Sequence, residues 1–387
     1  MSTDRISERI ETVIVGGGQA GLATGYHLAR RGQPFVILDA EDRIGGAWRN
    51  RWDSLRLFTP AQYDGLPGWR FPAPAWSYPT KDEMADYLEA YADRFDLPVR
   101  TSTRVDRIWR DGGRFIVGTT DRLIEADRVV VAAGAHRDPW TPALASELDI
   151  DVVQLHSSEY RRAAQLAEGS VLVVGAGNSG AEIAYEVART HPTVLAGRDV
   201  GQIPVRHGGP GVRLVFPVIR FVGHHVLTSR TPIQRKIGRK VAFGAKPLIR
   251  IKSKQLAEAG VERVPKVVGV EDGMPVLEDG RRIQVGNVIW STGFRQDFSW
   301  IDLPVFDADG SPLHDRGIVR SLPGLYFVGL LFQFSESSDV LPGVGRDARL
   351  VARHLAAHRP AAEPAELVGH RASPAGTAAL AQDRGTA

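Results

Sequence analysis

Hydrophobic runs followed by glycine-rich turns occur at two places along the chain. Thr12–Val15 runs into Gly16–Gly21 and then into a helical stretch, and Ser170–Val174 runs into Gly175–Gly180 and a second helical stretch. Another apolar run follows each helix, and in the first unit it is Phe35–Leu38. Each unit therefore predicts a strand, a tight turn, a helix and a second strand parallel to the first.

Further apolar runs predict the elements around these two units. The predicted elements are the helices Lys81–Asp93 and Val344–Ala357 and the strands Phe115–Val117, Val129–Val131, Asn287–Trp290 and Leu325–Val328. Two of these strands end in small residues, at Ala132–Gly134 and Ser291–Gly293, where we expect the chain to cross between domains. The predicted fold class is α/β, with two Rossmann-like dinucleotide-binding domains, one inserted in the other.

Composition narrows the classes of function. The chain has 387 residues, of which 43% are hydrophobic and 24% charged, as in globular proteins. Its 48 Lys and Arg nearly balance 45 Asp and Glu, which does not favour a nucleic-acid partner. Cysteine is absent, which excludes disulfides, Cys nucleophiles and thiolate metal sites, and we expect no metal.

Targeting signals are not expected. Met1–Glu11 is polar, unlike a signal peptide, and the longest apolar stretch, Val212–Leu227, is interrupted by arginine and histidine. A cytoplasmic protein is predicted. Beyond Arg359 the chain is rich in Ala, Pro and Gly, and we expect a disordered tail over 359–387.

The first glycine motif has the spacing of a dinucleotide fingerprint. Gly16 permits the turn, Gly18 lets backbone N–H groups approach a pyrophosphate, and Gly21 lets the helix pack closely on the strand. Asp39 lies 23 residues after Gly16, where a carboxylate accepts a hydrogen bond from a ribose hydroxyl. A tight turn without a ligand is the alternative interpretation.

The second motif, Gly175, Gly177 and Gly180, has Arg198 at the same 23-residue distance. A guanidinium binds a ribose 2′-phosphate, so that this site favours NADPH over NADH. A solvated surface arginine is the alternative. Two dinucleotide sites in one chain suggest that FAD occupies the first site and that NADPH delivers hydride from the second.

Several further motifs occur in the order found in one family. They are Gly45–Trp48, Trp52–Pro60, Tyr78–Lys81, His156–Tyr160, Ser291–Phe294, Gly324–Gly329 and Gly343–Ala348. With the two glycine motifs, they make residues 10–357 resemble the class B flavoprotein monooxygenases, most of all the plant-type indole-3-pyruvate monooxygenases and related bacterial NADPH/FAD oxidoreductases.

The resemblance implies an FAD domain formed by 1–148 and 295–358 and an NADPH domain at 149–294. It also implies an activity in which NADPH reduces FAD, O2 forms a C4a-(hydro)peroxyflavin, and a small organic substrate is oxygenated. The residues expected to bind the cofactors are Gly16, Gly18, Gln19, Ala20, Gly21, Asp39, Ala40, Gly46, Trp48, Val105, Ala133, Gly134, Gly175, Gly177, Asn178, Ser179, Gly180, Arg198, Ser291, Thr292 and Gly293. Trp48 is preferred over Trp52 as the residue packing on the flavin ring.

Two positions depart from the family pattern. The linker motif retains His156 and Tyr160, but Ile150 and Val152 replace its expected Phe and Gly. His156 is then either a linker residue or an ordinary helix cap or core histidine. Phe58 stands where relatives place a polar residue facing the flavin, and we interpret it as an aromatic packed near the ring. An NADPH oxidase or electron-transfer reductase therefore stays open as an alternative.

The segment 200–257 is strongly basic, with twelve Lys and Arg and no Asp or Glu. Apolar residues interleave with these charges, among them Leu214, Phe216 and Phe221. We interpret the segment as a solvated insertion in the NADPH domain that attracts the anionic cofactor. A membrane-surface element is less favoured, as is the related hypothesis of a non-catalytic flavoprotein that regulates transport.

Overall fold

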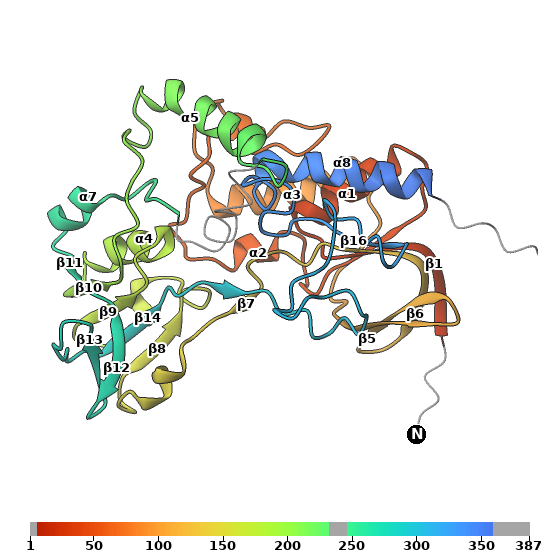
Figure 1. Cartoon of the computed structure of the whole chain (residues 1–387). Helices are drawn as coiled ribbons and strands as arrows, with labels where there is room; N and C mark the ends of the chain where they lie inside the picture. The colour runs from red at the N-terminus through yellow and green to blue at the C-terminus, as the bar shows by residue number, and fades with distance from the viewer. Residues whose placement is uncertain (1–5, 232–245, 359–387) are drawn as a thin grey trace, which may run out of the picture.

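Two β-sheets, one mixed and one parallel and each flanked by helices, lie side by side in the computed structural model, which describes residues 6–231 and 246–358 (Figure 1). The first sheet has the strand order β3-β2-β1-β6-β5-β4, and β16 pairs with the C-terminal end of β6. Its strands are β1 (Ile6–Val15), β2 (Val36–Leu38), β3 (Val99–Arg100), β4 (Val105–Asp111), β5 (Arg114–Thr119), β6 (Leu123–Val131) and β16 (Leu325–Phe327). Only the pairs β4–β5 and β5–β6 are antiparallel in this sheet.

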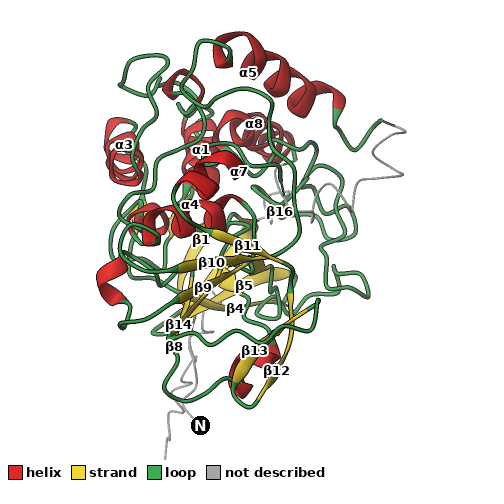
Figure 2. Cartoon of the chain, turned by 90° about the vertical axis from the view of Figure 1, so that its left-hand side faces the viewer, coloured by secondary structure: helices red, strands yellow, loops and turns green. Residues whose placement is uncertain are grey.

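Three helices pack over the first sheet (Figures 1 and 2). They are α1 (Gln19–Ala29), α3 (Lys81–Arg94) and α8 (Leu341–Ala357). Ile14 and Ile37 of the sheet, Leu22 of α1, Leu88 of α3 and Val351 of α8 are all fully buried in one apolar cluster. This apolar cluster thus packs the N-terminal strand and helix against α8, the last described helix.

The second sheet is entirely parallel, with the order β11-β10-β9-β14-β8. Its strands are β8 (Val153–His156), β9 (Val171–Val174), β10 (Thr193–Ala196), β11 (Glu262–Val264) and β14 (Asn287–Trp290). Helices α4 (Asn178–Val187) and α7 (Ser253–Glu258) pack on it, and the hairpin β12 (Val267–Glu271) and β13 (Met274–Leu277) lies beside it. Near-continuous apolar strands such as β9 suit a sheet that is covered on both faces.

Two short strands mark where the chain passes between the sheets. β7 (Asp138–Pro139) pairs antiparallel with β15 (Phe294–Arg295), directly after the ends of β6 and β14. The second sheet is completed before β16 returns to the first. The predicted fold class is therefore confirmed: two dinucleotide-binding domains, one inserted in the other. The domain boundaries near 148 and 294 remain our proposal.

The structure shifts several predicted elements. β1 begins at Ile6, so that part of the polar N-terminal stretch is strand and pairs with β6. α8 begins at Leu341, before the glycines that the sequence placed at its start. The hairpin β4–β5 was not predicted in full, because its outer strand has exposed polar residues. The tail 359–387 lies outside the described residues.

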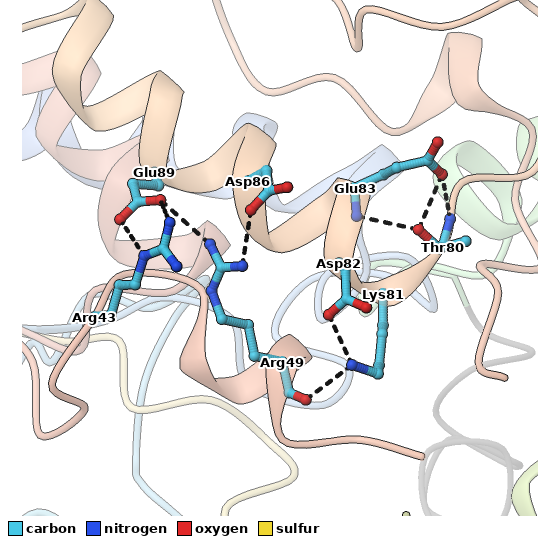
Figure 3. Close-up of polar contacts among 8 residues, drawn as sticks. All are labelled: Arg43, Arg49, Thr80, Lys81, Asp82, Glu83, Asp86 and Glu89. Carbon is cyan, nitrogen blue, oxygen red and sulfur yellow. Dashed lines mark hydrogen bonds and ion pairs between the residues drawn. The ribbon is translucent and has the colours of Figure 1, made fainter. Parts of the chain in front are cut away.

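Helix α2 (Gly46–Arg49) is held to α3 by a polar network (Figure 3). Arg49 pairs with Asp86 at 2.7 Å and with Glu89 at 3.3 Å, and Arg43 bonds Glu89 through two nitrogens at 2.6 Å each. The buried Lys81 ammonium donates to the Arg49 carbonyl at 3.1 Å. Together these contacts fix the segment that carries Trp48.

Helix α3 begins with a capping box, also visible in Figure 3: the Glu83 N–H donates to the Thr80 hydroxyl, and the Thr80 N–H donates to the Glu83 carboxylate. We predict that Thr80→Ala lowers the free energy of unfolding by about 1 kcal/mol, because it leaves a helix N–H group without its acceptor. Urea denaturation measures the loss. Thr80→Ser keeps the hydroxyl and should match the wild type, and an unchanged Thr80→Ala would contradict the prediction.

Candidate functional site

The first glycine loop leaves the start of α1 open. A Cβ on Gly16, which has φ +109°, would lie 2.4 Å from the Ala132 carbonyl oxygen, and one on Gly21 would lie 1.9 Å from the Gly16 carbonyl oxygen. A Cβ on Gly18 would meet nothing within 4 Å. Gly18 is the N-cap of α1, and no side chain caps the helix there. The loop thus has the free N–H groups and the space that a pyrophosphate needs.

Asp39 lies beside this loop, directly after β2. A Cβ on Gly17 would come within 2.4 Å of the Asp39 carboxylate, and the Glu41 N–H donates to that carboxylate at 3.3 Å. Burial raises the pKa of Asp39. The carboxylate is therefore placed where a ribose bound along the loop would present its hydroxyls.

The second glycine loop has nearly the same backbone geometry as the first. A Cβ on Gly175, also at φ +109°, would lie 2.2 Å from the Ser291 carbonyl oxygen, and one on Gly180 would lie 1.8 Å from the Gly175 carbonyl oxygen. Gly177, the uncapped N-cap of α4, again faces open space. The start of α4 therefore offers a second anion-binding helix terminus.

The two loops differ at the end of the second strand. The Gly16 N–H donates to Leu38 and the Gly175 N–H donates to Ala196, so that Asp39 corresponds to Gly197 in the structure. Arg198 stands one residue further on, although its sequence distance equals that of Asp39. It is exposed and makes no ion pair with any described residue. At Gly197 a Cβ would lie 2.9 Å from the Ala176 nitrogen, so the position that holds Asp39 in the first loop is closed to a side chain in the second.

The first residue of each helix uses its side chain differently. Gln19 accepts from the Trp48 indole N–H at 3.2 Å and donates to the Asp339 carbonyl at 3.3 Å, which brings Trp48 to the start of α1. Asn178 instead bonds backbone, donating to the Pro247 carbonyl at 3.1 Å and accepting from the Ile249 N–H at 2.9 Å. Asn178 thus positions residues 247–249, which lie within the basic segment.

Glycines 45 and 46 are needed for packing. A Cβ on Gly45 would lie 2.8 Å from the backbone of Ala85 in α3, and one on Gly46 would lie 2.6 Å from the Glu41 carboxylate. The close approaches that these two glycines permit are to α3 and to Glu41. The other tryptophan of this region, Trp52, is buried in the apolar cluster of the second domain.

The remaining predicted residues surround the two loops. Ala20 is buried behind the first loop, Ala40 is exposed after Asp39, and Val105 shares an apolar cluster with Leu38. Ala133, Gly134 and Gly293 follow the strands β6 and β14 at the domain crossing. Ser179 lies half-buried in the first turn of α4, the Thr292 hydroxyl donates to the Trp140 carbonyl, and the Ser291 hydroxyl is buried without a protein partner.

His156 and Tyr160 are held by hydrogen bonds within the second domain. The His156 ring is buried and bonds the Gly293 carbonyl at 3.0 Å and the Ser158 hydroxyl at 2.8 Å. Tyr160 is fully buried and donates to Glu186 of α4 at 2.8 Å. Burial, reinforced by Glu186, raises the pKa of the Tyr160 hydroxyl. Both side chains therefore hold the second domain together, His156 beside the crossing at Gly293 and Tyr160 against α4.

Sequence reasoning missed three residues at this junction. Glu186 also accepts from Ser54, which precedes the Phe58 segment of the first domain. The Arg51 guanidinium lies 5.0 Å from the Phe294 ring, and its Nε donates to the Ala47 carbonyl at 3.2 Å. These partners come from distant parts of the chain, and no local pattern indicates them.

Phe58 is 36% exposed, so its ring is not packed into the protein core. Its carbonyl accepts from His207 at 3.1 Å, and the His207 ring lies 3.9 Å from that of Tyr78. Burial lowers the pKa of His207 to about 4. The apolar ring of Phe58 thus offers no hydrogen-bonding group to its surroundings.

Two uncapped helix termini in adjoining dinucleotide-binding domains define a class: the flavoprotein oxidoreductases that transfer hydride from a nicotinamide to a flavin. Residues 13–204 match the pyridine nucleotide-disulphide oxidoreductase family. A CzcO-like oxidoreductase of Geobacillus kaustophilus, described as uncharacterized, is 39% identical, with 90% of this chain and 99% of that protein aligned.

Two further relatives identify the branch. A probable indole-3-pyruvate monooxygenase of Arabidopsis thaliana, YUCCA3, is 30% identical over 89% of this chain and 86% of its own length. The structure of a flavin-containing monooxygenase from Stenotrophomonas maltophilia is 30% identical, with a TM-score of 0.71, and covers 90% of this chain and 99% of that one. The chain belongs to the class B flavoprotein monooxygenase family, it is an oxidoreductase, and its cofactors are FAD and NADPH.

The two open glycines provide a matched test of the cofactor sites. We predict that Gly18→Val folds normally but weakens FAD binding at least about tenfold, because the new side chain fills the space before α1. Gly177→Val should weaken NADPH binding and leave FAD binding unchanged. Titration of each cofactor against both variants measures this, and loss of FAD in Gly177→Val alone would reverse the assignment.

Proposed function

We propose that this protein is an NADPH-dependent flavin monooxygenase acting on a small organic substrate. The overall reaction consumes NADPH, a proton and O2, and it yields NADP+, water and a substrate carrying one oxygen atom. The observation that carries the proposal is the pair of matching loops: Gly18 and Gly177 both open at uncapped helix N-termini, and the second loop has Gly197 and Arg198 where the first has Asp39.

The chain's own residues would bind and orient the cofactors. FAD, when bound, supplies the chemistry, because it accepts the hydride and activates O2. The N–H groups at the start of α1 would hold its pyrophosphate, and Asp39 its ribose. Gln19 fixes the Trp48 indole at the same helix terminus, where its ring can pack on the cofactor.

The linker residues His156 and Tyr160 would help to hold the FAD site and the NADPH site at a fixed distance and angle. His156 ties the end of β8 to Gly293, and Glu186 joins Tyr160 to Ser54 of the other domain. Because hydride transfer requires the two rings to be within contact distance, contacts that fix the angle between the domains act on the reaction rate. This proposal assigns His156 and Tyr160 positioning roles.

The apolar side chain at position 58 favours one alternative function, an NADPH oxidase or electron-transfer reductase. Its partly exposed ring offers no hydrogen bond to an oxygenated flavin, whereas several relatives have a polar residue there. A non-catalytic regulator has less support, since the family comparisons identify an enzyme.

Coupling measurements separate these activities. We expect that NADPH bleaches the flavin without oxygen, and that in air the protein releases less H2O2 than the NADPH it consumes when a suitable substrate is present. The panel should contain sulfides, amines and aromatic 2-oxo acids, since one relative is named for indole-3-pyruvate. Stoichiometric H2O2 with every compound would favour the oxidase, and absence of bleaching would favour a regulator.

Arg198 provides the test of cofactor choice. We predict that Arg198→Ala loses about 1.5–3 kcal/mol of NADPH binding, the value of a hydrogen bond to a charged group. This corresponds to about tenfold to over a hundredfold in affinity. NADH use should hardly change, because NADH lacks the 2′-phosphate. Anaerobic flavin reduction rates with both cofactors measure the shift in preference.

Arg189 is a matched control, because it is an exposed arginine just beyond the C-terminal end of α4, opposite the glycine loop. Arg189→Ala should keep the wild-type preference. If Arg198→Ala also keeps it, or if the wild type prefers NADH, Arg198 is a solvated surface residue and the 2′-phosphate assignment fails.

A further inference from the structure

Helix α5 (Val212–Phe221) and the π-helical turn Val222–Val226 form one continuous segment at the outer edge of the molecule (Figures 1 and 2). Among the described residues, ten large hydrophobic side chains are exposed, and six of them lie in this short segment. They are 36–77% exposed: Leu214, Val218, Ile219, Phe221, Val222 and Val226. We call the surface they form the α5 patch. Such clustering distinguishes it from scattered surface hydrophobics.

The inner face of the segment is firmly attached to the protein. Val212 is buried, and Phe216 stacks on Tyr63 with ring centroids 5.2 Å apart. At Gly223 a Cβ would lie 2.9 Å from the Glu336 carboxylate, and the Arg346 guanidinium donates to the carbonyl of the next residue at 2.8 Å. The orientation of α5 is therefore set by its contacts.

The outer face is apolar where water-facing helices are polar. Leu214, Val218 and Phe221 follow the spacing i, i+4, i+7, which places them on one side of a helix, opposite Phe216. No described element covers them, as their exposure shows. A single hydrophobic face directed at solvent indicates a surface that binds something apolar.

The charges around the α5 patch are positive. Arg213 is exposed beside it, with its guanidinium 5.8 Å from the Trp76 ring, whereas Arg220 is half-buried on the inner side, 5.2 Å from the Tyr63 ring. The sequence from 200 to 257 has no Asp or Glu. Glu336, the acid beside the π turn, is paired with Lys246 at 2.9 Å. The patch therefore combines apolar side chains with an exposed arginine, Arg213, that forms no ion pair with any described residue.

We propose that the α5 patch docks this protein on an anionic lipid surface. Leu214, Val218 and Phe221 enter the boundary between headgroups and acyl chains, while exposed basic side chains such as Arg213 contact lipid phosphates. The segment lies along the surface, because no helix of the described residues is long and apolar enough to cross a bilayer. Charge disfavours a second copy of the chain, since pairing two patches would bring like-charged arginines together.

Vesicle flotation of the FAD-loaded protein tests this. We expect flotation with phosphatidylcholine vesicles containing about 30% phosphatidylglycerol, weaker at about 0.15 M salt than at low salt. Pure phosphatidylcholine should retain little protein. The double variant Leu214→Glu/Phe221→Glu should lower partitioning into anionic vesicles at least about tenfold, because it removes two membrane-inserting side chains and adds negative charge.

The control is the double variant Ile150→Glu/Leu313→Glu, which adds the same charge at two exposed hydrophobic positions outside the patch. It should float like the wild type, and both variants should keep their FAD. Failure of the wild type to float with anionic vesicles would overturn the proposal, as would equal loss in the control. A dimer in light scattering that only Leu214→Glu/Phe221→Glu dissociates, without vesicle binding, would assign the patch to a second copy.

Discussion

At the end of β1 the backbone of Gly16 approaches Ala132 so closely that a Cβ would lie 2.4 Å from the carbonyl oxygen, and Gly175 approaches Ser291 in the same way. Each contact brings a strand, the following helix and the end of a neighbouring strand together at one point. Any side chain there would push β6 or β14 away and misplace the helix terminus. Both helix termini that we propose as nucleotide-binding sites depend on this pair of backbone contacts.

The same contacts determine where the domains meet. The residues after Ala132 and Ser291 cross between the sheets, so that the β7–β15 pair begins beside both loops. His156 fastens this crossing through the Gly293 carbonyl, and Phe294 packs against its ring with centroids 5.2 Å apart. The distance between the two cofactor sites is therefore a property of backbone geometry at the crossing.

The fold was largely predictable from the sequence, because glycine spacing and apolar strands are local signals. Contacts and structural equivalences between residues far apart in the sequence could not be predicted in this way. Arg198 shares a sequence distance with Asp39, yet the hydrogen bond from Gly175 to Ala196 shifts the structural equivalence to Gly197. The packing of Gly45 against α3 and the outward face of Leu214 also depend on tertiary neighbours. Charge and hydropathy alone favoured a solvated insertion in that segment.

The discontinuous first domain has a consequence for synthesis of the chain. Val129–Val131 of β6 lies between Val13–Val15 and β16, and β16 is translated only after the whole second domain. Until then one edge of this valine run has no strand partner, and α8 is missing from the core around α1. Unpaired apolar strand edges promote aggregation. This strand edge therefore stays unpaired while residues 132–324 are translated, and the last described helix completes the core that covers the first strands made.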